Sequence, residues 1–409
     1  MLPETITEGP STNPLRRVWR AGPSGLNDFL GRPQALIPIF LLALPLPFVL
    51  QYFVDDYGWT GGEYWLRIAT LAALWAGLTL ALNIMVGYAG LFNIGFIAFY
   101  GIGSYAYALV ASDQLHLHLP LWWAFVIVVL ACLAFALLLG LPALRLRGDY
   151  LAIVTLAFAI IAQELVLDLD RPPTLLGHQF GPDSLNITNG SQGINLVDRL
   201  RLPDNLPLLH GLAIQTRSYY WVALALAAVF AYLSLRWRGT RVGRAWVAIR
   251  EDELAARAMG INVYLYKLLP FCAGSVMAGV VGMVSTAWIA DADPMTFDLS
   301  QALLPFMMLF LGGVGSIPGA IIGAGIVTAL PFVLQPLVYY KWVIFSLVLV
   351  VLIIFRPQGL MGTVMMRPRS RLGGTVELLT EESPAAGSEE SARLEAATGV
   401  IVVNRTASP

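Results

Sequence analysis

Polar and glycine residues interrupt a stretch whose composition otherwise suits a membrane. Residues 82–105 read LNIMVGYAGLFNIGFIAFYGIGSY. Glycine inside a helix costs about 1 kcal/mol relative to alanine, and a buried amide side chain needs a hydrogen-bond partner. Residues of these types at short intervals suit the passage of a polar solute better than they suit covalent chemistry. The candidate pathway residues are Asn83, Gly87, Gly90, Asn93 and Gly95.

Two interpretations of this stretch stay open at the level of sequence. Small residues let membrane helices approach closely, and a second cluster, LGGVGSIPGAIIGAGI at 311–326, repeats glycine at every fourth position. Alternatively, residues 82–105 form a broken or re-entrant segment, which is tolerated only where it is buried in protein or lines a wet cavity. Interrupted segments of that kind frame substrate sites in transporters.

The second candidate region is the polar loop 236–267, RWRGTRVGRAWVAIREDELAARAMGINVYLYK. It predicts one helix over 244–259. An acid–base pair at i and i+4, Glu253 with Arg257, supports this helix. It is supported further by an apolar stripe of Trp246, Ile249, Ala256 and Met259, and by Gly260 as the expected stop. This helix either packs on the membrane face or docks on another protein. The residues assigned to such coupling are Arg244, Trp246, Ile249, Arg250, Glu253, Ala256 and Gly260.

Composition excludes several classes of function. The chain has 409 residues, of which 57% are hydrophobic and 12% charged, where soluble domains carry about 25% charged residues. A net charge of −1 gives no reason to expect nucleic acid as a partner. Cys132 and Cys272 both lie in apolar runs, so neither a disulfide framework nor a metal site is expected.

No catalytic site of its own is expected for this chain. Its lysines, Lys267 and Lys341, do not follow glycine, which rules out a Gly-Lys-Ser/Thr phosphate loop. Neither a His-Glu-x-x-His nor a Gly-x-Ser-x-Gly pattern occurs, and no span contains paired carboxylates. An intramembrane enzyme is therefore the weakest class, and any ATP used for transport must be hydrolysed by a separate chain.

Hydropathy predicts an all-α polytopic membrane protein of about ten transmembrane helices, with a broken glycine-rich segment and a cytoplasmic coupling helix. A span needs about 20 apolar residues, and part of 302–335 is a candidate re-entrant piece. The expected spans are 36–54, 64–86, 91–111, 121–144, 150–167, 218–235, 268–290, 302–313, 317–335 and 342–355.

Basic residues orient these spans with both termini in the cytoplasm. Of 25 Lys and Arg residues, this arrangement leaves outside only Arg67, Arg171, Arg199, Arg201, Arg217 and Lys341. The expected organisation is a cytoplasmic N-terminal tail, a transmembrane permease domain and a disordered cytoplasmic tail, at 1–34, 35–365 and 366–409. Within the permease domain, 168–217 is the periplasmic loop and 236–267 the cytoplasmic coupling loop.

Three blocks carry a resemblance to a known family. They are residues 82–105, LRLRGDYLAIVTLAFA at 144–159, and GRAWVAIREDELAARAMGINVYLYKLLPF at 243–271, which LGGVGSIPGAIIGA follows later. The chain resembles, over about 36–365, the LivM-like permease subunits of branched-chain amino-acid ABC importers. Ala255, Ala256 and Gly260 match the EAA…G element of ABC importer permeases, while Leu254 stands where that element has Glu.

The resemblance implies a place in a larger assembly in the bacterial inner membrane. Its expected partners are a homologous LivH-like permease, two ABC ATPase subunits that bind the ATP, and a periplasmic substrate-binding protein. The chain would hold no cofactor and would pass branched-chain amino acids, or alternatively urea, amides or other amino acids. A self-sufficient secondary transporter is a further alternative, but such proteins carry charged residues deep in their spans, and here Glu164 is nearly alone.

Overall fold

The fold comes from a computed structural model of the chain. The structure describes residues 40–41, 43–45, 62–114, 117–146, 148–170, 174–175, 178–179, 186–199, 216–334, 359–361 and single positions between 340 and 354. Both predicted tails, 1–34 and 366–409, lie outside the described residues. So do nearly all of the predicted spans 36–54 and 342–355, and therefore the total of about ten spans stays a prediction.

The described part is predominantly helical, as expected. Its longer helices are α5 (Gly62–Leu82), α6 (Phe96–Val110), α7 (Leu121–Ala143), α8 (Asp149–Asp168), α9 (Thr216–Arg238), α12 (Val263–Ile289), α13 (Leu299–Gly312) and α14 (Ile317–Val333). Two short helices, α10 (Arg241–Glu251) and α11 (Glu253–Ala258), connect α9 to α12. The only strands here are the antiparallel pairs β1 (Thr174–Leu175) with β2 (His178–Gln179) and β3 (Ile194–Asn195) with β4 (Asp291–Ala292).

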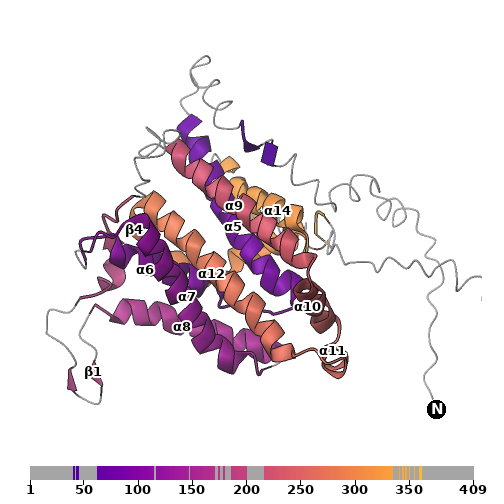
Figure 1. Cartoon of the computed structure of the whole chain (residues 1–409). Coiled ribbons are helices and arrows are strands. Elements are labelled where there is room, and N and C mark those ends of the chain that lie inside the picture. Colours follow the sequence, from indigo (N-terminus) through magenta and orange to yellow (C-terminus); the bar gives the residue numbers. More distant parts are fainter. Residues whose placement is uncertain are drawn as a thin grey trace, which may run out of the picture. The chain divides into compact units, whose positions relative to one another are not determined.

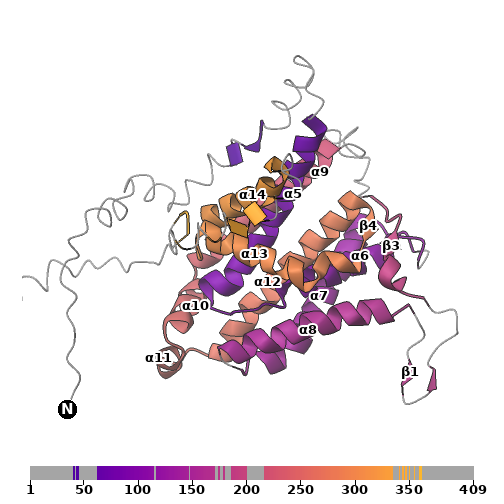
Figure 2. The same ribbon diagram turned by 180° about the vertical axis from the view of Figure 1, so that it is seen from behind.

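Helix α12 lies between two groups of helices (Figures 1 and 2). On one side it packs against α6 and α7, with α8 beyond them, and on the other side it packs against α5, which contacts α9, α13 and α14. Helices α10 and α11 lie at the end of the bundle where α12 begins, and β4 lies at the end where α12 finishes (Figure 1). The end that carries α10 and α11 is called here the near end, and the end that carries β4 the far end.

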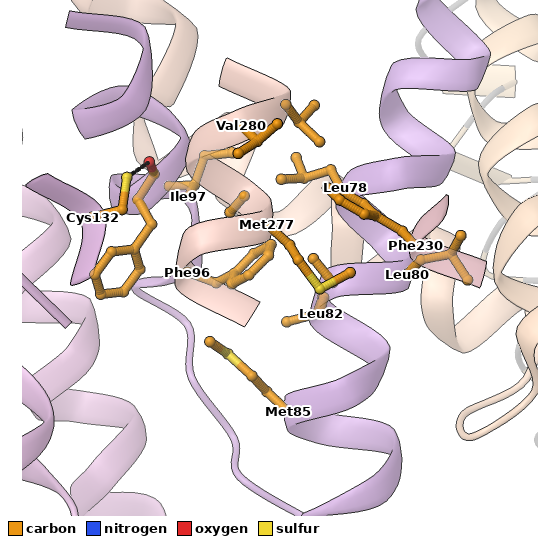
Figure 3. Packing of buried hydrophobic residues seen from close by; sticks show 14 of the residues in the cluster. Leu78, Leu80, Leu82, Met85, Phe96, Ile97, Cys132, Phe230, Met277 and Val280 are labelled. Carbon is orange, nitrogen blue, oxygen red and sulfur yellow. Dashed lines mark hydrogen bonds between the residues drawn. The ribbon is translucent and has the colours of Figure 1, made fainter. Parts of the chain in front are cut away.

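The core forms where these groups meet. Figure 3 shows side chains of α5, α6, α7, α9 and α12 packed together around Met277 of α12. Leu78, Phe96 and Ile97 are each 1% exposed. The thiol of Cys132 lies 3.8 Å from the carbonyl oxygen of Phe99, and both cysteines are free.

The helices also have the composition of membrane spans. Five of them in the described residues are long and apolar enough to cross a bilayer: Tyr64–Tyr88, Leu121–Ala143, Tyr150–Asp168, Ser218–Arg238 and Val263–Ile289. On α7, Trp122 and Trp123 are 69% and 62% exposed at the helix start, where aromatic side chains suit the membrane interface. The all-α polytopic class is therefore confirmed.

Glycines cluster at two places in the predicted spans. At the first, the predicted start is wrong: the span expected at 91–111 begins only at Phe96, because the chain before it is not helical. At the second, the spans expected at 302–313 and 317–335 correspond to two helices, α13 and α14, joined by a tight turn that contains Gly313 and Gly315 at positive φ. Gly319 and Gly323 of α14 face the α13 backbone, since a Cβ on either would lie within 2.4 Å of a carbonyl oxygen of that helix. In this second cluster, close packing is confirmed.

Candidate functional site

In the stretch 82–105, regular helix is interrupted toward the near end of the bundle. Helix α5 passes into a π-helical turn, η2 (Asn83–Tyr88), and regular helix resumes only with α6. The N–H of Leu91 reaches back to the carbonyl oxygen of Met85 at 2.9 Å, and Gly90 takes a φ of +68°. Single π-turns occur frequently at functional sites. The prediction of a broken segment is confirmed.

Close packing fixes the glycines of this break. A Cβ on Gly95 would lie 1.9 Å from the carbonyl oxygen of Thr155 in α8. A Cβ on Gly87 would lie 2.1 Å from the side-chain oxygen of Asn83 and 2.9 Å from the backbone nitrogen of Gly315. Packing and breakage are therefore one arrangement, because the glycines admit the neighbours that hold the irregular backbone.

The two asparagines are buried with half of their hydrogen-bonding groups unused. Asn83 Oδ1 accepts the backbone N–H of Gly315 at 2.8 Å, while its Nδ2 has no partner. Asn93 Nδ2 lies 3.6 Å from the sulfur of Met85, while its Oδ1 has no partner. Leaving such a group unpaired costs about 1–3 kcal/mol. Unpaired amide groups of Asn83 and Asn93 at a break in the spans are consistent with a pathway for a polar solute.

Arg250 of α10 joins this break to the loop outside the spans. Its guanidinium Nη1 donates a hydrogen bond to the carbonyl oxygen of Gly87 in η2. Its side chain also passes beneath Gly90, where a Cβ would lie 2.9 Å from Arg250 Cγ. The structure thus brings together residues that the sequence had assigned to two separate sites, the pathway and the coupling loop.

The predicted single helix over 244–259 is wrong. The chain forms α10 and α11 with a break at Asp252, whose backbone is extended at φ −153° and ψ 110°. The carboxylate of Asp252 accepts the N–H groups of Leu254 and Ala255 at 2.8 and 3.0 Å. An aspartate cap of this kind starts a new helix, and the run of good helix formers hid this signal in the sequence.

The apolar stripe of this loop faces inward rather than toward a partner. Trp246, Ile249 and Ala256 are 2%, 5% and 4% exposed. The indole N–H of Trp246 donates to the carbonyl oxygen of Tyr266 at 2.8 Å, and Ile249 and Ala256 pack with Val263. The expectation that these three side chains insert into another protein is therefore wrong. They fix α10 and α11 against the start of α12.

The side chains that point outward are different ones. Leu254 and Met259 are 64% and 83% exposed, so the assignment of Met259 to the apolar stripe is wrong. Arg244 is exposed as well. Leu254, in the first turn of α11, and Met259, just after its last residue, form an apolar surface called here the tip of α11. The sequence did not predict this surface, because the periodicity was read over 244–259 as one unbroken helix.

Glu253 and Gly260 take their predicted local roles. Glu253 pairs with Arg257 at 3.2 Å, one helical turn away, and with Lys267 of α12 at 2.7 Å. Gly260 has a φ of +83° and ends α11, where the N–H of Ile261 returns to the carbonyl oxygen of Ala256 at 3.1 Å. This is the glycine-dependent Schellman arrangement. It directs the chain from α11 into α12.

Nothing in the described residues resembles a metal centre, since no group of three or more His, Cys, Asp or Glu side chains there is placed to hold an ion. Glu164 of α8 is exposed and takes no part in the break. The helices, the interrupted spans and the capped loop together define a membrane permease.

Comparison with known proteins places this permease in a family. Residues 64–356 match the family described as the permease component of branched-chain amino acid transport systems. The chain belongs to this family. It is 30% identical to the high-affinity branched-chain amino acid transport system permease protein LivM of Escherichia coli, over 82% of this chain and 76% of that protein.

Two further relatives widen the comparison. The probable branched-chain amino acid transport permease protein LivM of Methanocaldococcus jannaschii is 23% identical over 72% of this chain and 93% of its own. The permease protein LivH of Escherichia coli is 33% identical over 35% of this chain and 46% of its own. No solved structure matches the chain.

Proposed function

We propose that this chain is one of two permease subunits in an ATP-driven importer of branched-chain amino acids. Membership of the family and the substrate class for which its relatives are named support the substrate class of this chain. Its similarity to LivH supports a homologous second permease as partner. Two ABC ATPase subunits and a periplasmic substrate-binding protein complete the assembly in the bacterial inner membrane. The chain itself holds no cofactor, has no catalytic site and has both termini in the cytoplasm.

The observation that carries this proposal is the contact of Arg250 with the carbonyl oxygen of Gly87. It links a helix outside the spans directly to the break within them. When the ATPases close on ATP, they move α10 and α11, and Arg250 moves the backbone of η2. Asn83 then passes the displacement to the turn at Gly315. A ligand-driven change of this kind needs an element with two arrangements, and the irregular backbone supplies it.

Reconstitution tests this function. In proteoliposomes that hold both permeases and both ATPases, with binding protein outside and ATP inside, labelled leucine should accumulate. Omitting the ATPases should abolish uptake. Uptake by this chain alone would favour a secondary transporter. Accumulation of urea or amides in place of leucine, with the same dependence on ATP, would keep the machinery and correct the substrate.

The exposed tip of α11 is the proposed contact for an ATPase. Leu254→Asp should prevent co-purification of the ATPases and reduce uptake by at least about tenfold, because an unpaired charge in an apolar contact is costly. The two permeases should still purify together. Ala256→Asp is a different case: Ala256 is buried within the chain, so this change should lower thermal stability. Normal ATPase association by Leu254→Asp would locate the contact elsewhere.

The proposed orientation places α10 on the cytoplasmic side, where it meets the ATPases, and the loop 168–217 on the periplasmic side. Asn186 is an exposed residue of the loop 168–217, and Glu251 ends α10. Cysteines introduced singly at these positions should react with a membrane-impermeant maleimide from opposite sides, Asn186 from the periplasm. Reaction of both from one side would overturn the topology.

A further inference from the structure

A seam of buried polar side chains runs between α6 and α12 and ends at the far end of the bundle. The hydroxyls of Ser104 and Thr286 share a hydrogen bond. The hydroxyl of Tyr100 donates to that of Ser285 at 2.8 Å. Buried polar groups are normally paired in this way, so this part of the seam is satisfied by the chain itself.

Two groups at the outermost point of the seam are not satisfied. Tyr105 is 4% exposed, and its hydroxyl has no hydrogen-bond partner. Asp291, in β4 just beyond α12, has a buried Oδ1 that also has no partner. The ring of Tyr105 packs edge-on against Phe297 at 5.9 Å between centroids, and Phe297 ends the short helix η4 (Pro294–Phe297) that Asp293 caps. Helix α6, which carries Tyr105, also packs against β4, which carries Asp291. These three residues are called here the Tyr105 cluster.

The Tyr105 cluster holds two carboxyl groups without a paired base in the described part of the chain. Burial raises the pKa of the Asp291 carboxyl, and the charge of Asp293 raises it further, while the backbone N–H of Ala292 opposes both. Within the described residues, no basic side chain forms an ion pair with Asp291 or Asp293. Asp293 is held in place because its carboxylate caps Met295 N–H at 2.8 Å.

Two other acidic residues at the same end do contact a basic side chain. His118 lies between Asp113 and Asp198, with nitrogen–oxygen distances of 2.8 and 2.7 Å. The segment that carries Asp198 is tied to the end of α12, because the N–H of Val197 donates to the carbonyl oxygen of Ala290 at 3.2 Å. Within the described residues, His118 therefore contacts Asp113 and Asp198, whereas no base pairs with Asp291 or Asp293.

We propose that the Tyr105 cluster binds a primary ammonium group. An ammonium has three donors and no acceptor, which suits the free oxygen of Asp291 and the phenolic oxygen of Tyr105. Its charge offsets one of the two carboxylate charges, beside a tyrosine hydroxyl that is itself buried. Identifying this ammonium as that of an amino acid under transport rests on the proposed function and on the far end being periplasmic. The amine site itself rests on neither.

The test uses the assembled transporter with 3-fluorotyrosine at position 105, observed by ¹⁹F NMR. 3-Methylbutylamine, which has the ammonium but no carboxylate, should shift the resonance in a saturable way. 4-Methylpentanoate, which has the same apolar part and no ammonium, should leave it unchanged. Asp291→Asn should weaken the amine response by at least about tenfold. Asp113→Asn, a change at the same end outside the cluster, should leave it intact.

The outcomes separate this site from the proposed function. No shift with the amine, an equal shift with the carboxylate, or an intact response in Asp291→Asn would overturn the site. A shift caused only by substrate-free binding protein would also overturn it, because Asp291 would then dock a basic residue of that protein. An amine response without ATP-driven uptake of leucine, urea or amides would keep the site and refute the importer. Leucine uptake without an amine response would do the reverse.

Discussion

Replacing Arg250 by alanine should abolish ATP-driven uptake while the transporter stays assembled and its ATPases stay active. The guanidinium links α10 to the carbonyl oxygen of Gly87 by a hydrogen bond. A hydrogen bond from a charged group is worth about 1.5–3 kcal/mol, which corresponds to roughly 10- to 100-fold in an equilibrium constant. We therefore expect the amount of leucine moved per ATP hydrolysed to fall at least about tenfold.

The control for this variant lies on the same helix. Arg241 is exposed at the start of α10, so Arg241→Ala removes an equal charge without touching the break and should keep uptake near normal. Arg250→Lys should recover part of the coupling, because lysine can donate to the carbonyl but lacks the planar group of arginine. Equal loss of ATPase activity and uptake in Arg250→Ala would indicate a structural role instead. Normal transport per ATP would refute the link.

Periodicity and composition predict the long helices of this chain closely. The span expected at 121–144 is α7 at Leu121–Ala143, and the span expected at 150–167 is α8 at Asp149–Asp168. Apolar runs of about 20 residues have one stable form in a bilayer, the helix. These bounds therefore depend on local composition, which the sequence states directly.

The break and the position of α10 against it depend instead on contacts between distant residues. Asn83 meets Gly315 across 232 positions, and Arg250 meets Gly87 across 163. Local sequence shows that the backbone near Gly87 is weak, but not which groups hold it. For the same reason, the sequence did not show that Trp246 faces the interior of the chain. An amphipathic stripe has the same pattern whether it faces a partner or the chain's own α12.

The second large effect concerns packing at the break. Gly95→Val should prevent folding of the transporter to its normal state, because the added Cβ would lie 1.9 Å from the carbonyl oxygen of Thr155. That oxygen belongs to the backbone, so no rotamer change relieves the clash and α6 must move away from α8. Overpacking of this kind costs about 1–3 kcal/mol or more. We expect little monodisperse protein after purification and a lower melting temperature for what remains.

Two comparison variants make the reason testable. A Cβ on Gly325 of α14 meets nothing within 4 Å, so Gly325→Ala should match or slightly exceed wild-type stability. A Cβ on Gly101 of α6 meets the ring of Phe297 at 2.4 Å, a side chain that can be shortened. Gly101→Ala should therefore destabilise the protein, and adding Phe297→Ala, which removes the clashing Cγ and Cδ atoms, should restore part of the loss. Shortening Thr155 to alanine should restore nothing in Gly95→Val, since the carbonyl remains. Rescue by that change would show that the side chain, and not the backbone of α8, limits the approach of α6.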